Sequence, residues 1–421
     1  MKPLDRDKII ALCLKLLENN KKMCKMPLSY FIEVLERAGK NWLNPDYHYR
    51  KKAIQVLAFI TGQSPPLIEE EMNIGFKLWN KDILYQILEK EIGIPDSLDG
   101  FVPLGNLKLR RWPYGLVIFN VSGNVFMVSP FMLAIGLLTK NCILMRVSSR
   151  EPYFAGYLLD SLIEIAPEIE NFLKVAYWKR NAWEDFLPKL PAHRIVLFHL
   201  GGEASCRYFR EITARLNIHS IIHGPAWGLI VLEEAKKEFA YDIAYDIVLW
   251  EQRACHSPRL VFVKGDYQAF ASLLAEALEG LNQRFPKIFS EATTINHLLA
   301  RQKFLVSSQV KLYAPPDTSY TVVSSSNRPR KKDFSHLTDR FIWVSPITKL
   351  DEVIDYLEQE DLIPYLQTVA YDGRDENFIR RITSLGASRL TSPGKMNQFL
   401  PGASHDGVYN LNLLTKLSTI Q

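Results

Sequence analysis

The segment EQRACHSPRLVFV, residues 251–263, carries the strongest candidate for covalent chemistry, Cys255. A cysteine thiolate is a strong nucleophile, and a neighbouring cation lowers the pKa of the thiol. Arg253 and His256 flank Cys255, and we expect them to favour the thiolate. A free cysteine is more often a small buried core residue. This segment alone therefore leaves both interpretations open.

A second segment, FNVSGNVFMVSPF at residues 119–131, carries amide side chains at a predicted strand-to-helix turn. The donors of Asn120 and Asn124 could stabilise an oxyanion that develops during acyl transfer. Asparagine and glycine are also favoured in turns for conformational reasons. The segment by itself therefore does not establish a catalytic role.

A third segment, FHLGGEAS at residues 198–205, places Gly201 and Gly202 between a predicted strand and a predicted helix. Backbone N–H groups at the start of a helix can bind a phosphate group. The segment lacks the complete GxGxxG pattern of a dinucleotide-binding turn, so the signal is weak when it stands alone.

Alternating helices and strands predict the framework that would position these residues. Residues 5–95 have apolar residues at three- and four-residue spacing, which is typical of amphipathic helices. From residue 115 to 216, apolar strand-like runs alternate with helical segments, and a second alternation extends from about 219 to 372. This pattern predicts parallel α/β sheets. We expect residues 306–340, which are polar and proline-containing, to be irregular and exposed.

Composition excludes several classes of protein. The chain has 421 residues, 47% hydrophobic and 23% charged, which is typical of globular proteins with more than one domain. A net charge of +5 without a dense basic face argues against nucleic-acid binding. The five cysteines form no CxxC pair, so we expect neither a disulfide framework nor a metal site.

The apolar segments do not have the features of targeting or membrane sequences. The N-terminal segment contains charged residues within its apolar pattern, unlike a signal peptide. The longest apolar stretch, residues 116–138, includes asparagine, serine, glycine and proline. We therefore expect no integral membrane segment and a cytoplasmic location.

Together, three segments resemble the aldehyde dehydrogenase superfamily, and specifically the LuxC-type acyl-CoA reductases. Residues 115–149 are similar to the asparagine-containing turn of that family with its following helix and strand. Residues 251–263 resemble its nucleophile segment, and FLPGASHDGVYNLNLL, residues 399–414, resembles its C-terminal His-Asp-Gly signature. The segments occur in the order of the family, and the resemblance covers about residues 95–415.

The resemblance implies an aldehyde dehydrogenase-like α/β fold. Such a fold has two Rossmann-like parallel α/β domains, one for the cofactor and one for catalysis, with a helical N-terminal region. We expect the domains to be as follows: 1–95, a helical region that packs on the cofactor domain; 96–218, the dinucleotide-binding domain; 219–390, the catalytic domain; and 391–421, a segment that returns to the cofactor domain.

The resemblance also implies a role for each matching residue. Cys255 takes the place of the nucleophile, and Asn124 takes the place of the amide that forms the oxyanion hole with the Cys255 backbone N–H. Arg146 stands where the superfamily usually has a lysine beside the adenosine ribose. Because a guanidinium suits a 2′-phosphate, we expect NADPH as the cofactor. The other expected cofactor-binding residues are Ser148, Gly201 and Gly202.

One departure from the superfamily concerns the direction of the reaction. Aldehyde-oxidising members have a glutamate that activates water to hydrolyse the acyl-enzyme, and the corresponding stretch here, SIIHGPAWG at residues 220–228, contains no carboxylate. Its absence is consistent with reduction, and also with a degenerate enzyme. His223 could act as the acid or base instead, although a histidine before Gly-Pro is more often a turn or packing residue.

We therefore expect NADPH-dependent reduction of a long-chain fatty acyl thioester to the aldehyde. The acyl donor would be acyl-CoA or an acyl-carrier protein. The expected partners are acyl-transferring or acyl-activating subunits, and we expect a homo-oligomer. Two alternatives stay open: an NAD(P)-dependent aldehyde dehydrogenase that forms the acid, and a catalytically degenerate subunit of a larger complex.

Overall fold

The computed structural model describes residues 2–288, 291–305, 309–335 and 337–421. The chain forms two compact units. The first contains Met1–Thr61, Glu69–Gly224 and Val408–Gln421, and the second contains Gly62–Ile68 and Pro225–Gly407. Among the described residues, none of the helices combines the length and the apolar character needed to cross a membrane.

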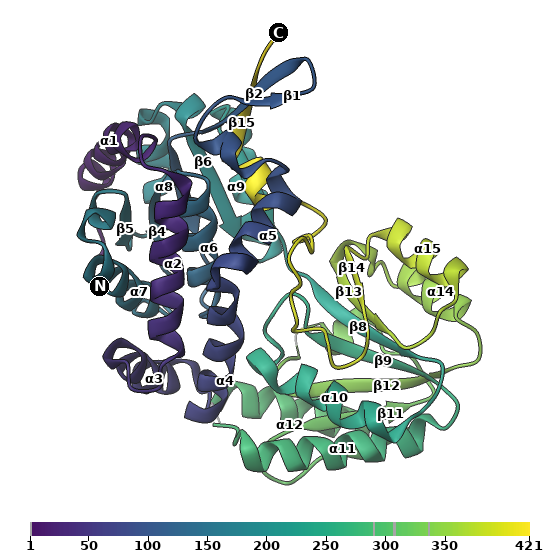
Figure 1. Cartoon of the computed structure of the whole chain (residues 1–421). Coiled ribbons are helices and arrows are strands. Elements are labelled where there is room, and N and C mark those ends of the chain that lie inside the picture. Colours follow the sequence, from purple (N-terminus) through teal and green to yellow (C-terminus); the bar gives the residue numbers. More distant parts are fainter. Residues whose placement is uncertain (1, 289–290, 306–308, 336) are drawn as a thin grey trace. The chain divides into compact units, whose positions relative to one another are not determined.

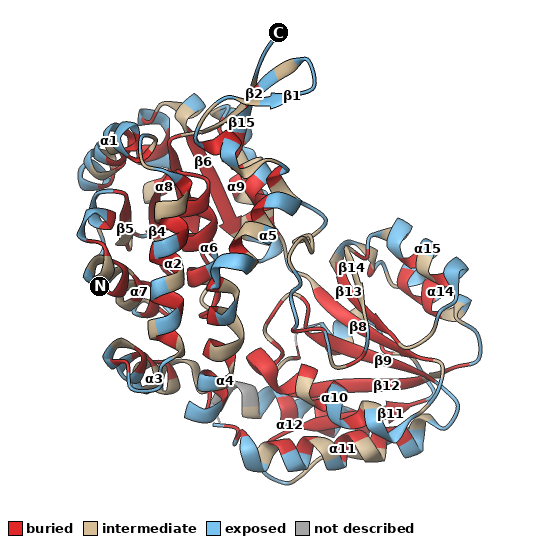
Figure 2. Ribbon diagram, viewed as in Figure 1, coloured by how far each residue is buried: buried red, intermediate tan, exposed pale blue. Residues whose placement is uncertain are grey.

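A five-stranded parallel sheet forms the core of the first unit (Figure 1). Its strand order is β5 (Leu173–Ala176), β4 (Cys142–Arg146), β3 (Leu116–Asn120), β6 (Ile195–Leu200) and β7 (His219–His223). All five residues of β3 are buried. Figure 2 shows the neighbouring strand β6 mainly in the colour of buried residues. Continuous apolar runs of this kind are typical of parallel strands that helices cover on both faces.

Helices surround this sheet, and α1, α6, α7 and α9 make the closest contacts with its strands. The helices of the first unit are α1 (Arg6–Met23), α2 (Leu28–Leu43), α3 (His48–Thr61), α5 (Lys81–Ile92), α6 (Val128–Leu138), α7 (Phe154–Ile165), α8 (Ala182–Phe186), α9 (Glu203–Arg215) and α16 (Asn410–Leu413). Helix α4 (Pro65–Phe76) has residues in both units.

A small antiparallel sheet explains why the C-terminus belongs to the first unit. Its strands are β1 (Val102–Leu104), β2 (Leu107–Pro113) and β15 (Thr415–Ile420), with β2 in the centre. The last strand pairs with β2 from Thr415 opposite Pro113 to Ile420 opposite Lys108.

A seven-stranded sheet forms the core of the second unit, and only its β10–β11 pair is antiparallel. Its order is β10 (Val310–Tyr313), β11 (Thr321–Ser325), β12 (Phe341–Ile347), β9 (Pro258–Lys264), β8 (Trp227–Leu232), β13 (Leu366–Tyr371) and β14 (Arg389–Thr391). The helices are α10 (Lys237–Val248), α11 (Tyr267–Arg284), α12 (Glu291–Leu305), α13 (Lys331–Phe334), α14 (Asp351–Gln359) and α15 (Glu376–Leu385).

Alternating strand residues build the core on one face of this sheet. Leu229 and Val231 of β8 and Leu260 and Phe262 of β9 belong to one apolar cluster, which also includes residues of α12, α14 and α15. Successive side chains of a strand point to opposite faces, so the intervening residues face the other side of the sheet. There α11 contacts β9, β11 and β12.

The predicted α/β fold is confirmed, and strands form within the predicted segments 115–121, 142–148 and 194–200. The expectation that residues 306–340 are irregular and exposed was wrong. This range contains β10, β11 and α13, and all five residues of β11 are buried. Its polar composition was misleading because the Thr321 hydroxyl is hydrogen-bonded inside the unit, to His297 and Arg301.

The division of the chain differs from the expected domain limits. Gly62–Ile68, expected in the helical N-terminal region, belongs to the second unit. The main segment of the second unit begins at Pro225 and not at residue 219, because β7 pairs in parallel with β6 and so belongs to the five-stranded sheet. The C-terminal return begins at Val408 and not at residue 391, because residues 391–407 cluster with the second unit.

Candidate active site

A strained turn precedes Cys255 in the second unit. Trp250, Glu251 and Gln252 have φ angles of 59°, 47° and 57°, which lie in the left-handed region. This conformation costs about 1–2 kcal/mol for a residue with a side chain, so three consecutive residues hold it only where the surrounding structure compels them. The turn ends at Arg253, and β9 begins at Pro258.

Segment 339–341 holds this turn in place. Arg340 binds both carboxylate oxygens of Glu251, at 3.0 Å from Nε and 2.7 Å from Nη2. Both side chains of this ion pair are almost completely buried, with exposed fractions of 0% and 1%. Phe341 N donates to Gln252 Oε1, and Gln252 Nε2 donates to the carbonyl oxygens of Phe341 and Pro258. The turn is therefore held in its conformation by a buried ion pair and by hydrogen bonds.

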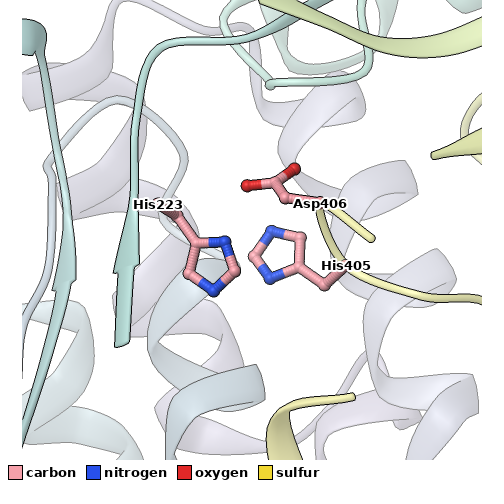
Figure 3. A group of neighbouring side chains, drawn as sticks. All are labelled: His223, His405 and Asp406. Carbon is pink, nitrogen blue, oxygen red and sulfur yellow. The ribbon is translucent and has the colours of Figure 1, made fainter. Parts of the chain in front are cut away.

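Cys255 is half-buried, and a buried glutamine contacts its sulfur. Gln367, on β13, donates from Nε2 to Cys255 Sγ at 3.1 Å and to Asp406 Oδ1 at 2.8 Å. The hydroxyl of Thr368 donates to Gln367 Oε1 at 2.8 Å. Figure 3 shows the carboxylate of Asp406 and the preceding His405, which lie shortly before the end of the second unit.

The environment of Cys255 differs from the sequence expectation. Burial raises the pKa of the Cys255 thiol to about 12, and the Asp406 carboxylate acts in the same direction. The groups that favour the thiolate and so lower this pKa are the Gln367 amide, the Arg389 guanidinium and the backbone N–H of Cys255 itself. Arg253 and His256, which we expected to do so, are not among the main causes of the shift.

Both expected cations are engaged elsewhere. Arg253 pairs with the Asp339 carboxylate. His256 is buried with its Nε2 at 2.8 Å from Asn397 Oδ1, and burial lowers its pKa to about 3. A neutral imidazole provides no positive charge beside the sulfur, so the expectation that these two neighbours activate Cys255 was wrong.

The two asparagines of the first unit differ in their surroundings. Asn124 is exposed, in the turn between β3 and α6. Asn120 is buried at the end of β3, where its Nδ2 lies 2.8 Å from His199 Nδ1 and its Oδ1 accepts a hydrogen bond from Arg146. Asn124 can therefore meet a ligand, whereas the amide of Asn120 is used within the fold.

A chain of hydrogen bonds runs across the carboxyl ends of three neighbouring strands. Arg146 on β4 donates to Asn120 on β3, which donates to His199 on β6, and His199 Nε2 lies 3.0 Å from Ser205 Oγ. Ser205 in turn donates to the carbonyl of Gly202. Burial lowers the pKa of His199 to about 4, so the imidazole is neutral and can accept at Nδ1 while it donates at Nε2.

Arg146 is half-buried, and part of its donor set is used inside the unit. Its Nε and Nη2 both donate to the carbonyl of Trp178, and its guanidinium lies over the Tyr177 and Trp178 rings. The edge that would form a planar fork around a phosphate therefore already contacts the backbone. Ser148 lies two residues further on and accepts from Arg150 N at 3.2 Å.

The carboxyl ends of β3 and β6 could hold a dinucleotide. Strand order reverses between them, and open α/β sheets bind ligands at such a point. Gly201 fits its turn only without a side chain, because a Cβ would lie 2.6 Å from His199 Nε2. A Cβ on Gly202 would meet no heavy atom of the described residues within 4 Å, so this turn leaves room for a phosphate at the start of α9.

His223 is the last residue of β7, and Figure 3 shows its ring. The side chain is buried, and its Nε2 lies 3.2 Å from Asn410 Oδ1 within the first unit. Its backbone carbonyl accepts from Gly201 N. The residue is therefore part of the sheet and not of a loop, which the sequence pattern before Gly224 and Pro225 did not indicate.

Sequence reasoning missed Gln367, Asp406 and the Glu251–Arg340 pair. A glutamine within an otherwise largely apolar strand is a signal that could have identified Gln367. Asp406 belongs to the His-Asp-Gly segment that carried part of the resemblance, but no role was given to it. Nothing in the sequence pairs Glu251 with Arg340, which is 89 residues away.

Comparisons with known proteins point to one family. The model of the family described as acyl-CoA reductase (LuxC) matches residues 23–417. A long-chain acyl-protein thioester reductase from Vibrio harveyi is 25% identical over 400 residues, covering 92% of this chain and 82% of the relative. A protein of the same name from Photobacterium phosphoreum is 25% identical over 424 residues, covering 98% and 84%.

Solved structures of the aldehyde dehydrogenase type have the same fold. An oxidoreductase from Marinobacter aquaeolei superposes with a TM-score of 0.77 at 14% identity, covering 99% of this chain and 91% of that one. Glyceraldehyde-3-phosphate dehydrogenase from Methanocaldococcus jannaschii, in complex with NADP, superposes with a TM-score of 0.76 at 14% identity, covering 100% and 95%. At these identities, the likeness concerns the fold alone.

Proposed function

Because the chain belongs to the acyl-CoA reductase (LuxC) family, we propose that it reduces a long-chain fatty acyl thioester to the aldehyde with NADPH, through an acyl group carried by Cys255. The observation that carries the proposal is the position of Cys255. Its half-buried thiol follows a strained turn that is anchored by a buried ion pair, and its sulfur accepts an N–H from Gln367. A core cysteine needs neither feature.

The first chemical step is acyl transfer to the protein. The Cys255 sulfur attacks the thioester carbonyl, and the thiol of CoA or of a carrier protein leaves. We assign Asn124 and the Cys255 backbone N–H as donors to the oxyanion that forms. The relatives named acyl-protein thioester reductases favour a protein-bound acyl donor, with acyl-CoA as the simpler substrate for an assay. Acyl-transferring or acyl-activating subunits are the corresponding partners.

The second step returns the acyl group as an aldehyde. Bound NADPH supplies the hydride for this step. The Gly201–Gly202 turn would hold its phosphates, and Ser148 lies near the carboxyl end of β4. We assign Arg146 to the 2′-phosphate, through the part of the guanidinium that does not donate to Trp178. Cys255 leaves the carbonyl carbon as the aldehyde forms.

The direction of the reaction, toward aldehyde and not toward acid, depends on how slowly water attacks the acyl-enzyme. The stretch 220–228 has no carboxylate that could activate water. Hydrolysis of the acyl-Cys255 thioester should therefore be slower than its reduction by NADPH. His223 is the residue of this stretch that we propose for proton transfer. Slow release of free acid without NADPH supports reduction, whereas rapid release would favour an aldehyde-oxidising or hydrolytic enzyme with His223 as its base.

The test measures NADPH oxidation with acyl-CoAs of several chain lengths, together with the fate of a labelled acyl group. Without NADPH, the label should stay on Cys255, and adding NADPH should release it as aldehyde. Cys255→Ala should abolish both results, whereas Cys24→Ala, which replaces the other half-buried cysteine, should change neither. Turnover by Cys255→Ala would refute the nucleophile assignment, and an inactive, unlabelled wild type would indicate a degenerate subunit.

A further inference from the structure

The orientation of the Gln367 carboxamide is determined by Asp406, and Thr368 adds a hydrogen bond to its oxygen. On one side, its Nε2 lies 2.8 Å from an Asp406 carboxylate oxygen, which accepts hydrogen bonds. On the other side, its Oε1 accepts from the Thr368 hydroxyl at 2.8 Å. Rotating the carboxamide by half a turn would bring its oxygen against the Asp406 carboxylate, and the repulsion between these two acceptors disfavours that orientation. The N–H edge is therefore the one that faces Cys255 Sγ, at 3.1 Å.

The position of Gln367 is as constrained as its orientation. The side chain is buried, with 5% of its surface exposed, on a strand whose six residues are all buried. A glutamine in such a strand needs partners for three polar groups, and Cys255, Asp406 and Thr368 supply them. An apolar residue would satisfy the same position in a purely structural role. The presence of a donor aimed at a sulfur therefore requires a chemical reason.

The other charged groups around Cys255 do not take the place of this donor. Arg389, on β14, favours the thiolate from a distance, but its nitrogens donate to Thr368 Oγ1 and to the carbonyls of Gln398 and Met396. Asp406 opposes the thiolate through its negative charge, and His256 is neutral. Among the described residues, Gln367 is thus the side chain that combines direct contact with Sγ and a favourable interaction with negative sulfur.

We propose that Gln367 is a catalytic residue whose carboxamide N–H donates to the Cys255 thiolate, and that Asp406 and Thr368 are positioning residues that hold the carboxamide in this orientation. The proposal rests on Cys255 being the nucleophile. The donor stabilises the attacking thiolate before acyl transfer. It acts again when the thiohemiacetal collapses, where the carbon–sulfur bond breaks, the electron pair returns to Sγ and the aldehyde leaves.

Alkylation by iodoacetamide tests this role without substrate or cofactor. The reagent reacts with the thiolate, so at a fixed pH below the thiol pKa its rate follows the thiolate fraction. Mass spectrometry of the peptide that contains Cys255 measures that rate. Gln367→Met, which preserves size and removes the donor, should slow alkylation of Cys255 by about 10- to 100-fold, the effect of one hydrogen bond to a charged group. Gln367→Glu should be at least as slow, because a carboxylate adds repulsion.

The controls separate this effect from damage to the fold. Cys24, in the first unit, should react at the wild-type rate in every variant. Gln359→Leu, at the exposed end of α14, should leave Cys255 unchanged. A variant that unfolds would expose Cys255 and speed its alkylation, so unfolding cannot imitate the expected result.

The positioning residues give a second readout. Thr368→Val should slow alkylation of Cys255 because the carboxamide loses the donor to its oxygen and is held less firmly, and Thr368→Ser should restore the rate. Asp406→Asn keeps an acceptor and removes a charge, so it should speed the reaction. Wild-type alkylation rates in both Gln367 variants would overturn the proposal. This outcome is distinct from failure of the proposed function, which turnover by Cys255→Ala would reveal.

Discussion

Replacing Arg340 by methionine should release the turn that precedes Cys255. The guanidinium makes two hydrogen bonds to Glu251 and one each to Asn282 Oδ1 and the Phe285 carbonyl. Its removal leaves the Glu251 carboxylate buried, with an exposed fraction of 1%, and without its cation. Three residues in left-handed conformations then lose the interaction that most directly compensates their strain.

The cost follows from the burial of the pair. Removing one partner of a buried ion pair destabilises a protein by about 3–5 kcal/mol, since the remaining charge stays buried without the partner that compensated it. Replacing both partners by apolar residues costs much less, because no charge remains buried. Glu251→Met and Arg340→Met should therefore each lose about 3–5 kcal/mol, and the double variant should lose less than either. The turnover that depends on Cys255 should fall in all three.

Native-state hydrogen exchange of peptides from β9 and β12 can measure this loss for the second unit alone. Arg381→Met is the matched control, because it breaks an exposed ion pair with Asp351 and should cost at most about 1 kcal/mol. Strictly additive losses in the double variant would refute the explanation by an uncompensated charge. A loss below about 1 kcal/mol for Arg340→Met would show that the pair does not anchor the turn.

Three further predictions concern the first unit and acid stability. Asn124→Ala should slow single-turnover acylation by about 10²–10³-fold with little change in substrate affinity, and a larger kinetic loss in Asn120→Ala would reverse their roles. Arg146→Ala should weaken NADPH more than NADH in equilibrium binding, and equal weakening would remove it from the 2′-phosphate. Burial lowers the pKa of His199 and His297 from 6.5 to about 4, so the unfolded chain binds more protons between these values. The free energy of unfolding should thus be highest above pH 6.5 and should decrease by about 3 kcal/mol per histidine as the pH falls toward 4. Denaturant unfolding at several pH values measures this decrease, which should be smaller in His297→Gln.

Local hydrophobic patterns in the sequence predicted much of the fold. Apolar runs such as GLVIFNV and RIVLFHL predicted buried strands, and β3 and β6 form there, because a parallel strand covered on both faces must be apolar along its length. The same reasoning did not predict the polar strand β11. Its Thr321 hydroxyl is buried and makes hydrogen bonds to His297 and Arg301, which lie 24 and 20 residues away in the sequence, and composition cannot reveal such contacts.

Some features of the candidate site could likewise be predicted from local sequence, and others could not. The sequence by itself predicted Cys255 as the candidate nucleophile, and it determined the positions of the asparagine-containing turn and of the glycines after β6, because each belongs to a contiguous segment of the chain. Only the tertiary structure decided the surroundings of Cys255. In the folded chain, Arg253 pairs with Asp339 and burial keeps His256 neutral. Gln367, which lies 112 residues further along the chain, contacts the sulfur of Cys255. A pKa depends on burial and on charges within a few ångströms, and neighbours in space are set by strand pairing and not by adjacency in the chain.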